Sequence, residues 1–204
     1  MTETTWGNGI QSRDEQRQLK RMAILRVAAQ AFNQAGFRQT SLDDLAQRLN
    51  VTKPTLYYYV KNKDDILEGI LEAAMARIRA VIAAEQNRPA SGLEKVRHFI
   101  TQFAAVQTDD FGACLILTRV YGLQTRFRDH YHTAAREVST ALRQMIAEGV
   151  QDGSIADCNP KYAASALLGT MNETVFWYLA EGKESPQDAA EEFLAVFEQG
   201  LVPR

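Results

Sequence analysis

Cysteine is scarce in this sequence, which has two in 204 residues, Cys114 and Cys158. They form no CxxC pair and no histidine pattern accompanies them, which argues against a zinc site and a disulfide framework. No apolar run approaches the roughly 18 residues that span a bilayer, and residues 1–12 lack the basic and apolar segments of a secretion signal. We therefore expect a cytoplasmic protein with no metal, no cofactor and no membrane partner.

Segments with the alternating pattern of β-strands are also nearly absent. Apolar residues recur at helical spacing, and capping residues mark helix starts. The sequence therefore predicts an all-α fold of about nine helices. The predicted helices cover residues 13–35, 41–49, 53–59, 63–84, 91–106, 113–121, 128–148, 160–180 and 186 onward, with an interruption over 107–112.

Charge is distributed unevenly along the chain, although the net charge is only −2. Residues 1–63 carry ten Lys and Arg against five Asp and Glu, whereas residues 64–204 carry thirteen against twenty. A polyanion would be attracted to the first third and repelled by the rest, which is typical of a separate DNA-binding head. The alternative is a chance asymmetry without function.

Two short predicted helices flank Asn50 and Val51, as in a helix-turn-helix. Asn50 stands at the bend, and asparagine tolerates the left-handed backbone that such a bend needs. A short helix cannot bury three successive positions on one side, so at least one of Tyr57, Tyr58 and Tyr59 should face outward. The residues expected to pack between the two helices are Leu45, Ala46, Leu49, Val51, Leu56 and Val60.

Three stretches of this region resemble one family. They are Ala28 to Phe32 with Gly36-Phe37, then Leu45-Ala46, and above all VTKPTLYYYVKNKDDIL from Val51 to Leu67. Over about residues 15–67 the chain resembles the TetR family of bacterial one-component transcriptional regulators. The resemblance implies a homodimeric repressor, not an enzyme, that binds palindromic operator DNA.

The predicted DNA contacts lie mainly on the second of the two short helices. The resemblance implies that the residues from Thr52 to Thr55 and from Tyr57 to Tyr59 touch DNA and that Lys63 clamps a phosphate. Tyr59 departs from the histidine often found there, and a phenol can still donate to phosphate. The full set is Ser41, Thr52, Lys53, Pro54, Thr55, Tyr57, Tyr58, Tyr59 and Lys63.

Asp43 lies where some relatives of the family place a basic or polar residue that reads bases. Its carboxylate could accept a hydrogen bond from cytosine N4, or it could help to cap the helix that starts after Ser41. We favour the capping role.

The domain organisation follows from these assignments. Residues 1–12 are expected to be disordered, residues 13–62 to form the DNA-binding domain, and residues 63–204 to form an effector-binding and dimerisation domain joined through the fourth helix. The resemblance assigns dimerisation to the last two helices, whose small residues would let a second copy approach closely, and the alternative is that both helices only cover their own core. The predicted dimer contacts are Ala163, Ala166, Leu167, Thr170, Phe193, Val196 and Phe197.

The middle helices are rich in aromatic residues and methionine, which suggests a cavity for a small lipophilic effector. Core packing is the alternative for each of these residues taken singly. The stretch from Ile146 to Tyr178 also resembles the effector domain of TetR members that sense acyl-CoA thioesters or related acids. The predicted pocket residues are Phe99, Phe103, Phe111, Leu115, Tyr121, Met145, Met171, Phe176 and Trp177.

Two other classes of protein are alternatives. An enzyme would need convergent polar groups, and His130 and His132, two positions apart, point to different sides of a helix. A non-specific architectural DNA-binding protein would not need an acidic, aromatic-rich second domain, and competition with random DNA distinguishes it.

Overall fold

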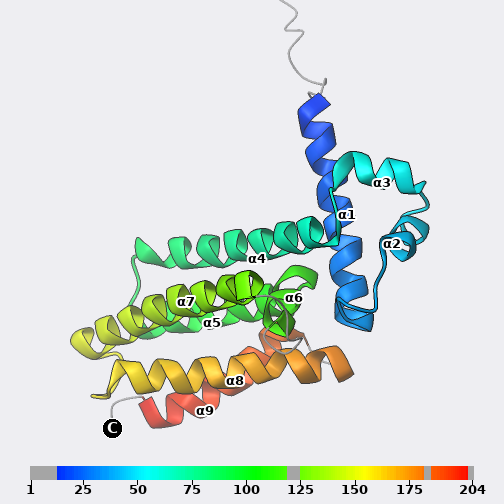
Figure 1. Cartoon of the computed structure of the whole chain (residues 1–204). Coiled ribbons are helices and arrows are strands. Elements are labelled where there is room, and N and C mark those ends of the chain that lie inside the picture. Colours follow the sequence, from blue (N-terminus) through cyan, green and yellow to red (C-terminus); the bar gives the residue numbers. More distant parts are fainter. Residues whose placement is uncertain (1–12, 119–124, 182–184, 202–204) are drawn as a thin grey trace, which may run out of the picture. The chain divides into compact units, whose positions relative to one another are not determined.

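The computed structural model describes residues 13–118, 125–181 and 185–201 of the chain. Within these ranges the chain forms nine helices and no strand, which confirms the predicted all-α fold (Figure 1). The predicted disordered segment, residues 1–12, lies outside the described residues. The helices are α1 Arg13–Ala35, α2 Leu42–Arg48, α3 Lys53–Tyr59, α4 Lys63–Gln86, α5 Gly92–Thr108, α6 Asp110–Thr118, α7 Thr125–Asp152, α8 Pro160–Glu181 and α9 Pro186–Leu201.

The chain divides into two compact units, the first ending at Gly69 and the second starting at Ile70. The boundary therefore lies within α4, later in the chain than the predicted position after residue 62. The first turns of α4 pack with α1, because Ile66 and Leu67 are fully buried and a Cβ atom added at Gly69 would lie 3.0 Å from Leu25 Cδ1. We call the first unit the head and the second the C-terminal unit.

The head is held together by an apolar core that α1, α2 and α3 share. Phe32 of α1, Leu45 of α2 and Leu56 of α3 are almost completely buried, and the three helices contact one another. Gly36 ends α1 with φ +88°, and Asn50 turns the chain between α2 and α3 with φ +52°, as predicted. These two turns fix where α2 and α3 point.

One residue of the predicted helix-turn-helix core lies elsewhere. Val51 is exposed instead of packed between α2 and α3, and it lies outside both helices, directly before Thr52, the N-cap of α3. Leu19 and Met22 of α1, which follow the helical apolar pattern, are exposed as well. The periodic pattern therefore overstates the buried face of α1.

The C-terminal unit is a helical bundle in which α5 contacts α7 and α9, and α8 contacts α7 and α9 (Figure 1). Two glycines, Gly92 and Gly149, allow α5 and α7 to approach closely. A Cβ atom added at Gly92 would lie 2.0 Å from the backbone nitrogen of Gly149, so no side chain fits there. Asp152 Oδ2 accepts a hydrogen bond from the Gly92 N–H at 2.7 Å and closes the same contact.

The predicted interruption over residues 107–112 is much shorter in the structure. Only Asp109 separates α5 from α6, and its Oδ1 accepts hydrogen bonds from the N–H groups of Phe111 and Gly112, at 2.9 Å each. The Asp109 carboxylate therefore caps α6, which starts directly after α5. The segment that was predicted to interrupt the helices is helical except at this one residue. The helix α7 is also longer at both ends than the predicted range 128–148.

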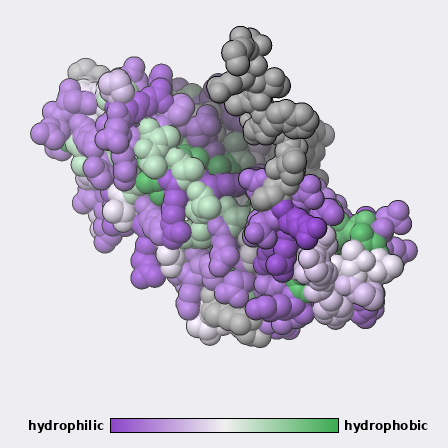
Figure 2. Space-filling model, turned by 90° about the horizontal axis from the view of Figure 1, so that it is seen from above, coloured by the Kyte–Doolittle hydropathy of each residue, from purple (hydrophilic) through white to green (hydrophobic). Residues whose placement is uncertain are grey.

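Hydrophilic side chains cover most of the face of the molecule shown in Figure 2. Large apolar side chains instead fill the interior, among them Phe99, Ile100, Phe111 and Leu142, which are fully buried. Among the helices that the structure describes, none combines the length and the apolar character required to cross a bilayer.

Candidate DNA-binding surface and ligand cavity

The helix α2 begins with a capping box formed by Ser41 and Asp44. The N–H and the hydroxyl of Ser41 both donate to Asp44 Oδ2, at 2.8 and 2.7 Å, and Ser41 Oγ accepts from the Asp44 N–H at 3.1 Å. The hydrogen bonds from Ser41 hold the pKa of Asp44 below its usual range. The predicted capping role of Asp43 is therefore wrong, because Asp44, at the third helical position, forms the capping box with Ser41.

Asp43 instead forms an ion pair with Lys53, the first residue of α3. The Lys53 ammonium nitrogen lies 2.9 Å from Asp43 Oδ1 and 3.1 Å from Asp43 Oδ2. The hydrogen bond with Asp43 raises the pKa of Lys53, so the lysine stays charged. The pair links α2 to α3 on the surface of the head.

The helix α3 buries one of its side chains, Leu56, and turns most of the others to solvent. Thr52 caps its start, because its Oγ1 accepts from the Thr55 N–H at 3.4 Å. Tyr57 and Tyr58 are 49% and 65% exposed, which confirms that tyrosines of this helix face outward. All the predicted contacts from Thr52 to Tyr58 lie on this exposed surface, and Tyr59 is half-buried.

An arginine of α1, which no motif in the sequence predicted, fixes the end of α3. Arg21 donates to the carbonyl of Tyr59 at 2.8 Å and forms a two-point ion pair with Asp65, at 3.0 and 3.2 Å. Burial raises the pKa of Asp65, but the hydrogen bonds from Arg21 and from the Lys61 N–H together outweigh this effect, so the pKa lies below its usual range. Arg21 thus ties α1, α3 and α4 together within the head.

Lys63, the first residue of α4, is engaged inside the head. Its ammonium donates to the carbonyl oxygens of Phe37 at 2.7 Å, Thr40 at 3.0 Å and Arg38 at 3.4 Å, and it lies 4.5 Å from the centre of the Phe37 ring. An ammonium has three hydrogens, and these bonds use all of them. Partial burial lowers the pKa of Lys63. The phosphate contact implied by the resemblance would require Lys63 to give up one of these carbonyls.

The residues predicted to line an effector pocket are mostly core residues of the C-terminal unit. Phe99, Phe103, Phe111, Leu115 and Met171 are buried, and Phe99 stacks on Phe103 with ring centres 5.5 Å apart. Phe176 is partly buried against the cluster of Ala113, Ile116 and Val175. Tyr121 and the side chain of Trp177 lie outside the described residues.

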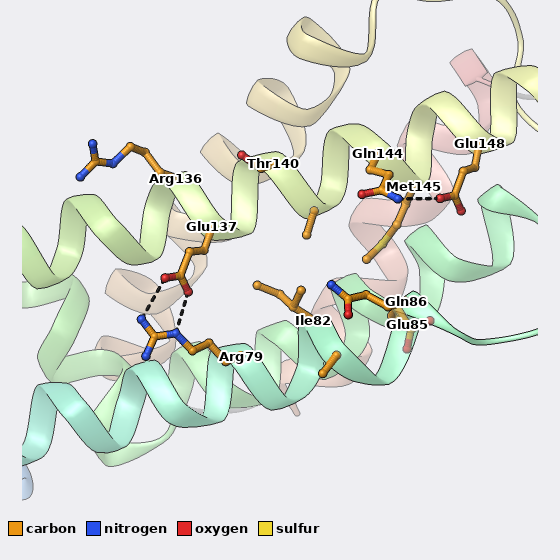
Figure 3. Close-up of a pocket in the computed structure, with 12 residues that line it drawn as sticks. Arg79, Ile82, Glu85, Gln86, Arg136, Glu137, Thr140, Gln144, Met145 and Glu148 are labelled. Carbon is orange, nitrogen blue, oxygen red and sulfur yellow. Dashed lines mark hydrogen bonds and ion pairs between the residues drawn. The ribbon is translucent and has the colours of Figure 1, made fainter.

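A cavity of about 500 Å³ lies between α4 and α7 (Figure 3). Of the predicted pocket residues, Met145 lines it. The other lining residues were missed because most are polar or charged and read as a solvated helix face. The lining set is Arg79, Ile82, Ala83, Glu85, Gln86, Arg136, Glu137, Thr140, Ala141, Gln144, Met145 and Glu148.

The cavity has charged ends and an apolar middle, as Figure 3 shows. At one end Arg79 forms a two-point ion pair with Glu137, at 2.9 and 3.0 Å. At the other end Glu148 accepts from Gln144 at 3.1 Å and from Lys95 at 2.8 Å. The apolar lining residues are Ile82, Ala83, Ala141 and Met145, and Figure 3 shows Ile82 between the two polar ends. This arrangement suits a molecule with an apolar body and a polar group.

Glu85, at one end of the cavity, is a buried carboxylate. One oxygen is bonded to His98 Nδ1, and Oε2 lies 3.7 Å from Arg88 and has no hydrogen-bond partner among the described residues. Burying a carboxylate is unfavourable unless it is paired, so His98 and Arg88 offset the cost of placing Glu85 here. The Nδ1 atom of His98 is therefore engaged with Glu85.

The predicted dimer residues fall into two groups in the structure. Leu167 is fully buried in its own subunit, so its assignment to the interface is wrong: it faces the core side of α8. The others are exposed or half-buried, with Val196 of α9 70% exposed. Tyr162 of α8, which was not predicted, is 68% exposed. The exposed or half-buried members of the set are Ala163, Ala166, Thr170, Phe193, Val196 and Phe197.

No group of three or more potential metal ligands occurs within the described ranges. Burial raises the pKa of the Cys114 thiol to about 12, which keeps it protonated at neutral pH. A protonated, inaccessible thiol is a poor nucleophile, so Cys114 belongs to the core.

Comparison with known proteins assigns both units. Residues 24–70 match the family model described as bacterial regulatory proteins, tetR family, and residues 89–201 match a tetracyclin repressor-like C-terminal domain. The HTH-type transcriptional repressor KstR2 of Rhodococcus jostii is 26% identical over 192 residues, which cover 90% of this chain and 91% of that protein. The fatty acid metabolism regulator protein of Bacillus subtilis is 24% identical over 173 residues, or 83% of this chain and 89% of that protein.

A solved structure has the same fold. AibR, crystallised in complex with isovaleryl coenzyme A and operator DNA, superimposes with a TM-score of 0.72 at 22% identity and covers 87% of this chain and 97% of its own. The second family model alone spans more than half of the chain. The chain therefore belongs to the TetR family of bacterial transcriptional regulators.

Proposed function

We propose that this protein is a cytoplasmic transcriptional repressor that binds palindromic operator DNA as a homodimer and is released by a small lipophilic effector, an acyl-coenzyme A or a related acid. The observation that carries the proposal is the exposed face of α3, which a rigid head presents to solvent. A single buried residue, Leu56, anchors that face, and Arg21 fixes its far end. The exposed face of α3 is fixed in position by these contacts and accessible to solvent, so it is suited to recognise a macromolecule.

The chemistry of this face matches the major groove of DNA. Threonine and tyrosine hydroxyls can bond phosphates or base edges, and the lysine can bond guanine or phosphate. The exposed residues are Thr52, Lys53, Pro54, Thr55, Tyr57 and Tyr58. One helix makes few contacts, and two heads on a palindrome double them.

The proposed homodimer uses the exposed side of α8 together with α9. Ala163, Ala166 and Thr170 are small, and a Cβ atom added at Gly169 would meet nothing within 4 Å, so the α8 backbone is open to close approach. Tyr162 and Val196 add exposed apolar area. Because exposed apolar side chains are stabilised by burial, a second copy of the chain is the occupant we expect.

The proposed effector site is the α4–α7 cavity. Its apolar middle suits an acyl chain, and Arg136, which donates to the carbonyl of His132, lies at an end where a phosphate or carboxylate could bind. Two relatives support the class of ligand, since one is named as a regulator of fatty acid metabolism and AibR was crystallised with an acyl-coenzyme A. The helix α4 supplies both Ile82 to the cavity and Lys63 to the head, so movement of α4 would couple effector to DNA.

A linked titration tests the proposal. Duplexes that the wild-type protein selects from a randomised library serve as operator, and isovaleryl-coenzyme A, longer acyl-coenzymes A and free fatty acids serve as effectors. A coupling of roughly 1–3 kcal/mol predicts that effector weakens operator binding about 5–150-fold, and that operator weakens effector binding by the same factor. A ligand that binds equally well with and without operator contradicts the coupling. Equal affinity for selected and random DNA would favour an architectural protein instead.

A further inference from the structure

A carboxylate lies among the residues of the proposed DNA-reading surface. Asp43 is 67% exposed and Lys53 is 49% exposed, and their charged ends are 2.9 Å apart. A negative charge on a surface that approaches phosphates weakens binding to every DNA sequence. Its presence there calls for a function other than affinity.

Helix capping does not account for Asp43, and its negative charge in the first turn of α2 stabilises that helix by only about 0.3–1 kcal/mol. The start of α2 is already capped by Ser41 and Asp44, which satisfy each other. An exposed ion pair typically contributes about 0–1 kcal/mol, so the bond to Lys53 adds little to the stability of the head. What the pair does provide is a fixed arrangement of one acceptor beside one donor.

That arrangement is complementary to a G·C base pair. In the major groove the pair presents the amino group of cytosine N4 beside the O6 and N7 acceptors of guanine. Cytosine N4 and guanine O6 are themselves hydrogen-bonded, so they lie about 2.9 Å apart. The oxygen of Asp43 and the nitrogen of Lys53 have the same separation, with acceptor facing donor and donor facing acceptor.

We propose that Asp43 is a specificity-determining residue that, with Lys53, reads one G·C base pair in each operator half-site. The carboxylate accepts from cytosine N4 while Lys53 donates to the guanine of the same pair. An A·T pair also presents an amino group beside an acceptor, adenine N6 beside thymine O4, but this donor lies between two acceptors, O4 and N7. A carboxylate at adenine N6 therefore faces an acceptor on each side, whereas at cytosine N4 it has the guanine acceptors on one side only, where Lys53 donates. This inference rests on the proposed DNA-binding function and assigns it a residue and a base pair.

Three variants test the assignment: Asp43→Asn removes the charge, Asp43→Ala also removes the acceptor, and Lys53→Gln removes the donor's charge. Glu72→Gln, in the C-terminal unit, is the matched control for a change of one charge. Each protein selects duplexes from a randomised library, and its affinities for the selected duplex and for random DNA are measured at several salt concentrations. Thermal unfolding verifies that each variant is folded.

We expect Asp43→Asn and Asp43→Ala to bind random DNA more tightly than wild type, because Lys53 is released to phosphates. The slope of log affinity against log salt should steepen by about 0.9 for the one added contact. Asp43→Ala and Lys53→Gln should each lose preference for G·C at the same position, by about tenfold. Glu72→Gln should match wild type in slope and base preference.

Two results would overturn the inference, and they are distinguishable. If wild type selects a defined sequence and Asp43→Ala selects the same sequence with undiminished preference at every position, Asp43 does not read a base, although the proposed function stands. If wild type shows no preference for any sequence over random DNA, the proposed function itself fails and the inference fails with it.

Discussion

Replacement of Lys63 by methionine separates two roles for one ammonium group. The structure engages its three hydrogens with the carbonyls of Phe37, Arg38 and Thr40, whereas family resemblance implies a phosphate contact. Methionine keeps most of the apolar stem and removes the charge. The control is Lys61→Met, because Lys61 is exposed, two residues away, and loses the same charge.

The magnitude follows from the bonds lost. A hydrogen bond to a charged group contributes about 1.5–3 kcal/mol, and a cation over an aromatic ring about 0.5–1 kcal/mol. The bond to Arg38 is long, at 3.4 Å, and water can replace part of the rest. We therefore expect Lys63→Met to lower the free energy of unfolding by about 2–4 kcal/mol, and Lys61→Met by less than about 0.5 kcal/mol.

Denaturant unfolding and the salt dependence of DNA binding are the two assays. If the carbonyls are the partners of Lys63, Lys63→Met is much less stable than Lys61→Met, and its salt slope changes no more than that of the control. A Lys63→Met protein as stable as wild type, with a salt slope lower by about 0.9, would refute this reasoning. The ammonium would then leave the carbonyls to hold a phosphate.

Three further predictions follow from the C-terminal unit and from the capping box. Ala166→Glu or Val196→Glu should yield a monomer in sedimentation velocity, because an unpaired charge would be buried in the proposed interface, and a persistent dimer would place the interface elsewhere. Ala141→Trp should fill the α4–α7 cavity and weaken acyl-coenzyme A binding at least tenfold by calorimetry, whereas Ala135→Trp, on the exposed side of α7, should not. The pKa of Asp44 is lower in the folded state than in the unfolded state, so the ionised carboxylate stabilises the fold above the unfolded-state pKa. This stabilisation is lost as the pH falls through the folded-state pKa. Asp44→Asn should therefore make stability depend less on pH below about pH 4, and an unchanged acid transition would contradict this.

Local signals in the sequence predicted most of the helices, because caps and turns are short-range features. Asn50 illustrates this, since its left-handed backbone could be expected from one residue and its neighbours. The interruption near Asp109 was overestimated for the same reason, because turn-forming residues there cap a helix instead of forming a loop. Local propensity identifies a break but does not determine its length.

Contacts between distant residues could not be predicted in the same way. Arg21 contacts Tyr59 and Asp65, 38 and 44 positions away, and no motif announces such a partner. The cavity was missed because its lining depends on which polar faces of α4 and α7 meet. Most residues of the predicted pocket are aromatic. Aromatic side chains bury more apolar area than smaller side chains, so these residues pack in the core instead of lining the cavity.

The partners of the lysines and arginines change how the charge of the head should be understood. Ten basic residues in the first 63 suggest a strongly attractive surface, but Arg21, Lys53 and Lys63 each have a partner within the head. A basic side chain that already has a carboxylate or carbonyl partner exchanges one contact for another when it meets a phosphate, so it adds less affinity than a solvated one. For Arg21 the exchange would also release the end of α3, which the proposed reading surface needs in place. The excess of positive charge therefore attracts DNA at a distance. Because Arg21 and Lys53 are already paired, they add little to the affinity for phosphates, and specific binding depends on contacts with the bases.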